Sequence, residues 1–186
     1  MKNSCFIMEE DEGGNFVRNY RGELIPIIWF TYTGADGEVI DEETTHIFVQ
    51  ARVIRARAFL LYYNIVEVIC HENVEKIEQD AFDGCKSLRQ VRMPGVKIVE
   101  EGAFIWCETL EDVECNKLEI IEKGAFERCR SLRIINLPSA RIVRRGAFRN
   151  CKALTKVKFG SKLERIEESA FLECTEKKGR HFTQIK

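Results

Sequence analysis

The stretch Ala103-Phe104-Ile105-Trp106-Cys107 contains the pattern A-F-x-x-C, and the recurrence of this pattern decides the fold of the chain. It occurs five times at intervals of 22 or 23 residues. The copies begin at Ala81, Ala103, Ala125, Ala147 and Ala170, and an incomplete sixth begins at Ala58, with Tyr62 in place of the cysteine. A constant period of this length is typical of solenoid proteins, in which each copy forms one coil that packs on its neighbours.

Each copy also contains two short runs that predict β-strands. The first run alternates apolar and polar residues near its ends, which is typical of half-buried strands. The second follows a turn that Pro94 and Pro138 mark in two copies. We expect the first runs to form one parallel sheet and the second runs to form the opposite wall. The first runs are residues 88–93, 110–115, 132–137 and 154–159, and the second are 96–99, 118–121, 141–143 and 163–166.

The segment from Gly102 to Cys107, and its equivalents, connect the second run of one coil to the first run of the next. Each is too short for a regular helix, so we predict one short helical turn per coil. The predicted fold class is therefore α/β, a β-dominated solenoid of about six coils. Its buried spine consists of Phe59, Phe82, Phe104, Phe126, Phe148 and Phe171.

These residues resemble the BspA-like, or Treponema-type, class of leucine-rich repeats, whose core is similar to I-x-x-x-A-F-x-x-C-x-x-L-x-x-[IV]-x-[LI]-P. The resemblance runs from about Val49 to Cys174. It implies a right-handed leucine-rich-repeat solenoid that recognises proteins and has no enzymatic activity. Members are known from bacterial surfaces and from unicellular eukaryotes, so the resemblance leaves the location open.

The repeat pattern divides the chain into three parts. Residues 1–44 are predicted to be an N-terminal tail and a capping hairpin, residues 45–174 the solenoid, and residues 175–186 a frayed C-terminal tail. The hairpin is expected from runs at 28–33 and 38–40, which flank a turn-rich link. Residues 1–22 are expected to be disordered or loosely attached. An uncovered last coil predicts possible homo-oligomers through the C-terminal coil.

Composition narrows the classes of partner. Twenty-nine basic and thirty acidic residues give a formal net charge of -1, so no global field attracts nucleic acid or an anionic membrane. We find neither an export signal at the start nor an apolar run long enough to insert in a membrane. The expectation is a soluble, cytoplasmic chain whose partner is a protein.

Seven of the eight cysteines fall on two repeating positions, which predicts reduced structural thiols in a reducing compartment. Cys70 and Cys115 lie two coils apart, about 10 Å at the usual strand spacing, which is too far for a disulfide. The three histidines are scattered, and no nucleotide-binding or nucleophile motif occurs. We therefore predict no catalytic residue, no cofactor and no metal site.

Two surfaces of the predicted solenoid carry alternating or clustered charge. Seven residues before each spine phenylalanine, the sign alternates in every coil, which predicts a scaffold ladder: Arg52, Glu75, Lys97, Glu119, Arg141 and Glu164. On the first strands, an acidic coil has basic coils on both sides, and the candidate protein-binding residues are Arg89, Arg92, Glu111, Asp112, Glu114, Arg133, Ile134, Lys156 and Lys158. Adjacent coils could instead neutralise each other there, so both interpretations stay open.

Trp106 is a further candidate for protein binding, because its column holds mostly polar or small residues in other coils. It could equally fill space against a neighbouring coil. Taken together, the sequence predicts a non-catalytic protein-interaction module with a rigid repeat surface. A structural self-assembling module and a fragment of a surface adhesin are the alternatives.

Overall fold

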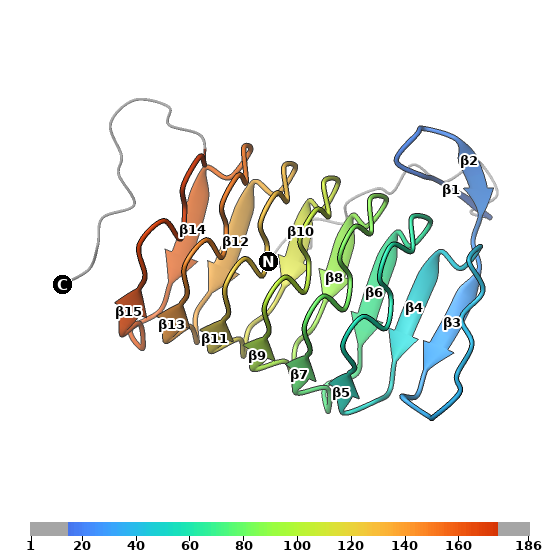
Figure 1. Cartoon of the computed structure of the whole chain (residues 1–186), viewed down its shortest axis with the longest axis horizontal. Helices are drawn as coiled ribbons and strands as arrows, with labels where there is room; N and C mark the ends of the chain where they lie inside the picture. Colours follow the sequence, from blue (N-terminus) through green and yellow to red (C-terminus); the bar gives the residue numbers. More distant parts are fainter. Residues whose placement is uncertain (1–14, 175–186) are drawn as a thin grey trace, which may run out of the picture.

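The structure is a computed structural model, and it describes residues 15–174. Within this range the chain forms fifteen short strands and no helix. Figure 1 shows two parallel rows of strands joined by the connecting turns of each coil. The first row contains β3 (Trp29–Tyr32), β4 (His46–Val49), β6 (Glu67–Cys70), β8 (Gln90–Arg92), β10 (Asp112–Glu114), β12 (Ile134–Leu137) and β14 (Lys156–Phe159). The second row contains β5 (Val53–Ile54), β7 (Lys76–Ile77), β9 (Ile98–Val99), β11 (Ile120–Ile121), β13 (Ile142–Val143) and β15 (Arg165–Ile166).

Except between β10 and β12, successive strands of each row pair in parallel and in register, so equivalent residues of the repeats form columns. Val91, Val113 and Ile135 point into the core. In each strand the residues immediately before and after them point outward. The second row forms one continuous sheet of six strands, which confirms the predicted opposite wall. The expected single sheet of the first row is wrong in one respect, because β10 and β12 are neighbours without a backbone ladder. There the Cys115 thiol donates to the Asn136 carbonyl oxygen at 3.5 Å.

The prediction of one helical turn per coil is wrong. In the third coil, Gly102 and Trp106 both have left-handed backbone, with φ of 65° and 62°. The Trp106 amide, which would donate to the Gly102 carbonyl oxygen in an α-helical turn, donates to the Glu127 carbonyl oxygen of the next coil at 3.0 Å. Instead, alternate amides bond to the next coil, as when the Phe104 amide donates to the Ala125 carbonyl oxygen at 2.8 Å. The segment is therefore a series of tight turns that continues the coil-to-coil ladder.

The spine phenylalanines are stacked in one internal row, as predicted. Consecutive rings lie 4.9–5.3 Å apart with interplanar angles of 0–8°. Phe59 to Phe148 are fully buried, whereas Phe171 in the last coil is half-buried. At the other end, the Tyr32 ring meets Phe59 edge-on at 5.2 Å and ends the stack. The solenoid core is thus closed at its N-terminal end by an aromatic side chain.

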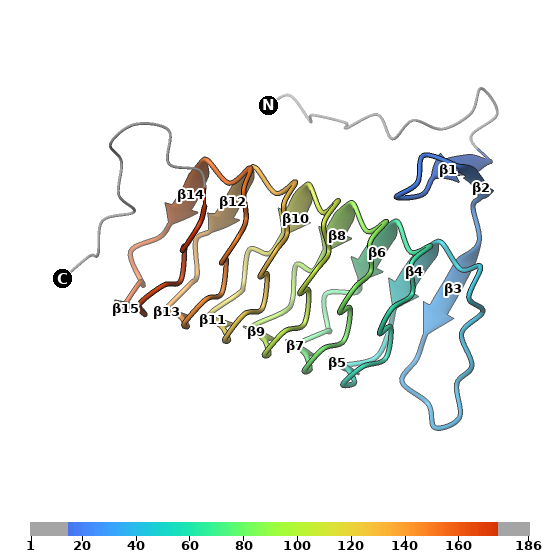
Figure 2. The same cartoon turned by 45° about the horizontal axis from the view of Figure 1, so that its top comes forward.

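The predicted capping hairpin at 28–40 is wrong. Residues 38–40 form no strand, and β3 pairs in parallel with β4 as an additional strand of the first row. The reason is that Phe30 and Tyr32 pack against the core and make β3 resemble a further coil. An antiparallel hairpin does form earlier, between β1 (Phe16–Arg18) and β2 (Leu24–Pro26). Figure 2 shows it above the start of the first row, next to β3 and β4.

This hairpin is attached to the solenoid, so the expectation of a loose segment is wrong for residues 15–22. Val17 is buried, and the Tyr20 amide donates to the Ser87 hydroxyl at 2.8 Å. The Tyr20 ring also lies 6.1 Å from Tyr63. Residues 1–14 and the predicted C-terminal tail, 175–186, lie outside the described residues.

Candidate functional site

The candidate surface is the outward side of β8, β10, β12 and β14 with the residue before each strand, here called the strand face. The ladder between β8 and β10 puts Asp112 beside Gln90 and Glu114 beside Arg92. The ladder between β12 and β14 puts Ile134 beside Lys156 and Asn136 beside Lys158. Nine of the ten residues predicted to bind protein are therefore brought together on one surface; Trp106 lies elsewhere. They are Arg89, Arg92, Glu111, Asp112, Glu114, Arg133, Ile134, Lys156 and Lys158.

Most charges on the strand face have no ionic partner in the part of the chain that the structure describes. Glu111, Glu114, Arg133, Lys156 and Lys158 are exposed and form no ion pair among residues 15–174. The alternative of mutual neutralisation between adjacent coils therefore does not describe these five side chains. The charged groups remain hydrated and available to a partner, so their desolvation and pairing would contribute to recognition rather than to folding.

Asp112 and Arg92 each contact a side chain on a neighbouring strand of the first row. The Gln90 side-chain amide donates to the Asp112 carboxylate at 3.3 Å. Arg92 lies 3.7 Å from Glu67 on β6, where the buried carboxylate anchors the guanidinium. Ile134 sits between the acidic and the basic coil and is 48% exposed. An exposed isoleucine surrounded by unpaired charges is a suitable apolar contact for a partner.

The second row of strands shows the opposite arrangement, because its charges are paired along the stack. Glu75 contacts both Arg52, at 2.9 Å, and Lys97, at 3.8 Å. Arg141 likewise contacts Glu119, at 3.9 Å, and Glu164, at 2.7 Å. The hydrogen bond from Arg52 lowers the pKa of the Glu75 carboxyl. The predicted charge ladder is therefore present, and its charges largely cancel.

A parallel ladder, not predicted from the sequence, runs beside it. Lys76 contacts Glu100 at 2.7 Å, and Arg144 contacts Glu122 at 3.4 Å and Glu167 at 3.0 Å. These glutamates recur four residues before the spine phenylalanines, so column alignment could have revealed them. Exposed pairs of this kind contribute little to stability, but they leave the second row without an excess of either charge.

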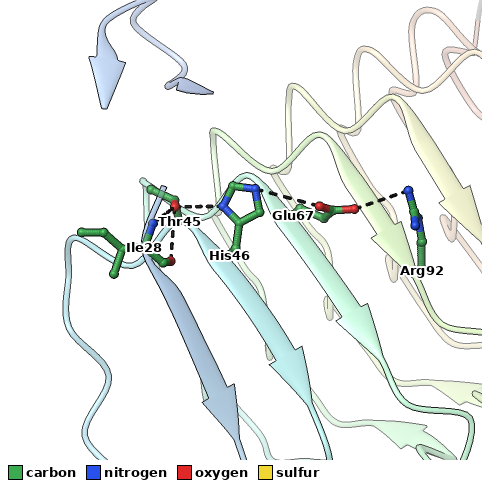
Figure 3. Close-up of polar contacts among 5 residues, drawn as sticks. All are labelled: Ile28, Thr45, His46, Glu67 and Arg92. Carbon is green, nitrogen blue, oxygen red and sulfur yellow. Dashed lines mark hydrogen bonds and ion pairs between the residues drawn. The ribbon is translucent and has the colours of Figure 1, made fainter. Parts of the chain in front are cut away.

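A chain of polar side chains, most of them buried, runs across β4, β6 and β8 of the first row (Figure 3). The Thr45 hydroxyl lies 2.9 Å from Nδ1 of His46, and the other ring nitrogen lies 3.9 Å from Glu67. His46 is 2% exposed and Glu67 is 7% exposed. Burial lowers the pKa of His46 to about 4. The imidazole is therefore neutral at physiological pH, and its contact with Glu67 is not a charge pair there.

Glu67 on β6 pairs with Gln90 on β8 and so shares the column of Asp112, but its place in the sequence gives no sign of its burial. The Trp29 ring packs at 4.8 Å from the His46 ring, and Arg92 lies beyond Glu67. Figure 3 shows Thr45, His46, Glu67 and Arg92 following one another across the strands. The outward side of β4 and β6 is thus covered by side chains of the protein itself. The surface that is available to a partner is the strand face, which begins at β8.

Trp106 lies on the turns and is 36% exposed. The Arg128 guanidinium lies 4.1 Å from the centre of its ring, and that of Arg130 lies 5.9 Å away. A cation over the ring covers part of the indole and stabilises the pair. Both interpretations of Trp106 thus hold in part: the neighbouring coil contacts one region of the ring, while the rest is exposed.

Seven cysteines of the described range are free and buried, as the reduced-thiol prediction requires. Burial raises the pKa values of Cys70 and Cys115 to about 12, so neither thiol is an effective nucleophile. Cys5 lies outside the described residues. Between residues 15 and 174 no group of histidine, cysteine and carboxylate side chains could hold a metal ion. The same range contains no helix that could span a membrane.

Comparison with known proteins identifies the repeat. The family described as BspA type Leucine rich repeat region matches residues 52–178 in six copies. No curated protein matches. A leucine-rich-repeat protein of T. pallidum is 28% identical, with a TM-score of 0.56 over 70% of this chain and 58% of that one. A leucine-rich-repeat protein of Bacteroides ovatus is 25% identical, with a TM-score of 0.61 over 78% of this chain and 34% of that one.

A third solved structure, a leucine rich cell surface protein of Faecalibacterium prausnitzii, shares the fold at 24% identity and a TM-score of 0.51. The match covers 84% of this chain and 44% of that protein. This chain therefore spans less than two thirds of each of these three proteins. The comparisons agree with a right-handed leucine-rich-repeat solenoid of about six coils.

Proposed function

Because this chain belongs to the BspA-type leucine-rich-repeat family, we propose that it is a non-catalytic protein-interaction module whose partner docks on the strand face. Leucine-rich repeats generally mediate protein interaction or surface adhesion, and repeat scaffolds bind through positions that differ between coils. Within residues 15–174 no group of histidine, cysteine and carboxylate side chains could hold a metal ion and compete with this surface as a binding site.

One observation carries this proposal: the two rows of strands differ in whether their charged side chains form ion pairs. Charges on the second row pair with each other. On the strand face, five charged residues form no ion pair with any residue between 15 and 174: Glu111, Glu114, Arg133, Lys156 and Lys158. Solubility requires charged side chains on the surface, but it does not require an acidic coil and a basic coil to be separated on one face. Unpaired, ordered charge supports selective recognition of a complementary protein surface.

The proposal is tested by charge reversal with a matched control. Affinity capture from the source cell is compared for the wild type, Glu111→Lys with Asp112→Lys, and Glu72→Lys with Glu168→Lys. The control reverses two exposed charges away from the strand face and changes the net charge equally. We expect the first variant to lose the captured protein and the control to retain it. Equal capture by both folded variants would exclude the strand face.

Self-assembly through the C-terminal coil is a second candidate. β14 and β15 form the outer edges of their sheets, and Val157, Phe159, Leu163 and Ile166 are only partly buried there. Against it, Lys156 and Lys158 project from the edge strand, and lysine on an edge opposes strand addition.

The adhesin alternative and the location rest on the thiols. A third related structure is described as a cell surface protein, but seven free, buried cysteines support a reducing compartment such as the cytoplasm for this chain. We therefore propose the cytoplasm, with an intracellular protein as partner. Thiol trapping in intact source cells tests this, and rapid modification by an impermeant reagent at the cell surface would contradict it.

A further inference from the structure

Within the strand face, the charges of β10, β12 and β14 reverse their sign across β12. Along one column the sequence is acidic, apolar, basic: Asp112, Ile134, Lys156. Along the neighbouring column it is acidic, neutral, basic: Glu114, Asn136, Lys158. Both columns change sign across the same strand. A surface with this order matches a copy of itself that runs in the opposite direction.

The symmetry that produces this match is a two-fold axis parallel to β12 and lying between two facing copies. Such an axis keeps the strand direction and reverses the order of the coils. Asp112 then faces Lys156 of the second copy, and Glu114 faces Lys158 of the second copy. Ile134 meets its own equivalent on the axis. In these two columns every charged residue faces a residue of opposite charge, and the two-fold axis makes each such pair occur twice.

We propose that the strand face binds the strand face of a second copy of this chain, with the two solenoids antiparallel about β12. This inference rests on the proposed function and names the partner of the same surface. The result is a face-to-face dimer. Both copies use the same surface, so the interface is self-complementary and no third copy can add to it.

The third column is compatible with the same arrangement. Glu111 faces Thr155 of the second copy, and Arg133 faces its own equivalent. The long Arg133 side chain is offset from Glu111 of the second copy by one strand, about 4.8 Å along the stack. It can therefore turn toward that carboxylate and away from the other guanidinium. Within one chain none of these groups forms an ion pair among the described residues, so dimerisation breaks no existing pair.

Other contacts between copies fit less well. A two-fold axis along the solenoid would place Glu114 against Glu114 and Lys158 against Lys158, which is repulsive. The second row has neutralised charge ladders that specify no orientation. Addition of strands at β14 would bring Lys156 and Lys158 together with their equivalents. The antiparallel face-to-face arrangement is the one in which the unpaired charges of β10 and β14 meet opposite charges.

The size of the patch sets the strength of the contact. Three short strands bury much less than the roughly 800 Å² per partner of a stable interface, so the dimer is weak and depends on concentration. Because its contacts are exposed ion pairs, it weakens as salt screens them. Local concentration within a complex or on a shared partner would increase its occupancy.

A charge-swap series tests the dimer by sedimentation over a range of protein concentrations, at low and at high ionic strength. The full chain is compared with Glu114→Lys, Lys158→Glu and the double variant. Each single variant creates two repulsive contacts, and we expect its association constant to fall about tenfold or more. The double variant restores both pairs across the axis, and we expect recovery to within about threefold of the wild type. Glu72→Lys and Lys117→Glu are controls of equal charge that should not affect association.

Carboxyl-to-amine cross-linking between isotope-labelled and unlabelled copies provides a measurement without substitutions. The expected product joins Glu114 of one isotopic form to Lys158 of the other. A wild type whose mass does not depend on concentration, or single variants that the swap fails to rescue, would overturn the dimer. If such a monomer still loses a captured protein when Glu111 and Asp112 are reversed, the proposed function stands with a different partner. If capture is also unaffected, both proposals fail.

Discussion

The thiol of Cys107 donates a hydrogen bond to the carbonyl oxygen of Phe82 in the preceding coil, at a distance of 3.2 Å. Four more thiols make the equivalent bond at 3.0–3.3 Å: Cys85 to Phe59, Cys129 to Phe104, Cys151 to Phe126 and Cys174 to Phe148. The cysteine of each repeat is therefore both a small apolar core residue and a donor that joins coils. In the first coil, where tyrosine replaces it, the Tyr62 hydroxyl donates to the Ile40 carbonyl oxygen instead.

Cys107→Ala should lower the free energy of unfolding by about 1–3 kcal/mol, because it removes a buried side-chain atom and a hydrogen bond between coils. Urea denaturation measures the change. Glu111→Ala, an exposed residue without a side-chain partner in the described range, is the control and should change stability by less than about 0.5 kcal/mol. Equal stability of the two variants would show that the thiol bond is unimportant.

The buried cysteines should resist thiol reagents in the folded protein. Cys70 and Cys115 have pKa values raised to about 12, so increasing the pH from 7 to 9 should not produce a reactive thiolate at either position. Mass mapping of alkylated peptides, with and without denaturant, measures this. We expect modification of the seven described cysteines only after unfolding. Rapid native labelling of Cys107 would mean that the coils open locally.

Phe104→Ala should destabilise the protein more than Phe171→Ala. Phe104 is fully buried between Phe82 and Phe126, with both ring centres 5.1 Å away, and truncation of such a side chain costs about 3–5 kcal/mol. Phe171 is half-buried in the last coil and leaves a smaller cavity. The comparison is made from the denaturant midpoints of the two variants, provided that the unfolding free energy of both depends on denaturant concentration with the same slope. A larger loss at Phe171 would contradict the description of the spine.

His46 should make stability depend on pH. Its pKa in the folded protein is about 4, below its ordinary value of 6.5, so the unfolded chain takes up the proton first. This contribution to stability is complete above pH 6.5 and is lost as the pH falls toward about 4, with a slope of at most about 1.4 kcal/mol per pH unit. His46→Gln should lose that part of the slope. Parallel curves for the two proteins in urea, at pH 7 down to 4, would show that His46 does not titrate as described.

Local chemistry made much of the fold predictable. The A-F-x-x-C spacing set the number of coils, and the alternation around Val91 identified the strand that points into the core. The helical turn could not be excluded from spacing, because the left-handed conformation at Trp106 is uncommon for any residue except glycine. The parallel pairing of β3 was also missed, since its four residues fit a hairpin and an extra coil equally well.

The candidate site was only partly predictable. Column alignment placed Glu111, Ile134 and Lys156 on one face, because residues at equal repeat positions lie in register. It left open whether Arg92 is available, because the position of a neighbouring carboxylate such as Glu67 depends on the orientation and burial of both side chains.

By itself, the sequence determined the period of the coils, the residues that face the core and the order of charges along each column, since these follow from composition at fixed spacing. Only the tertiary structure decided which charges are paired. Arg141 reaches Glu119 and Glu164 across the coils, while Lys158 reaches no carboxylate within residues 15–174. The physical reason is that an ion pair requires two side chains to approach within a few ångströms, and that approach depends on the path of the whole coil.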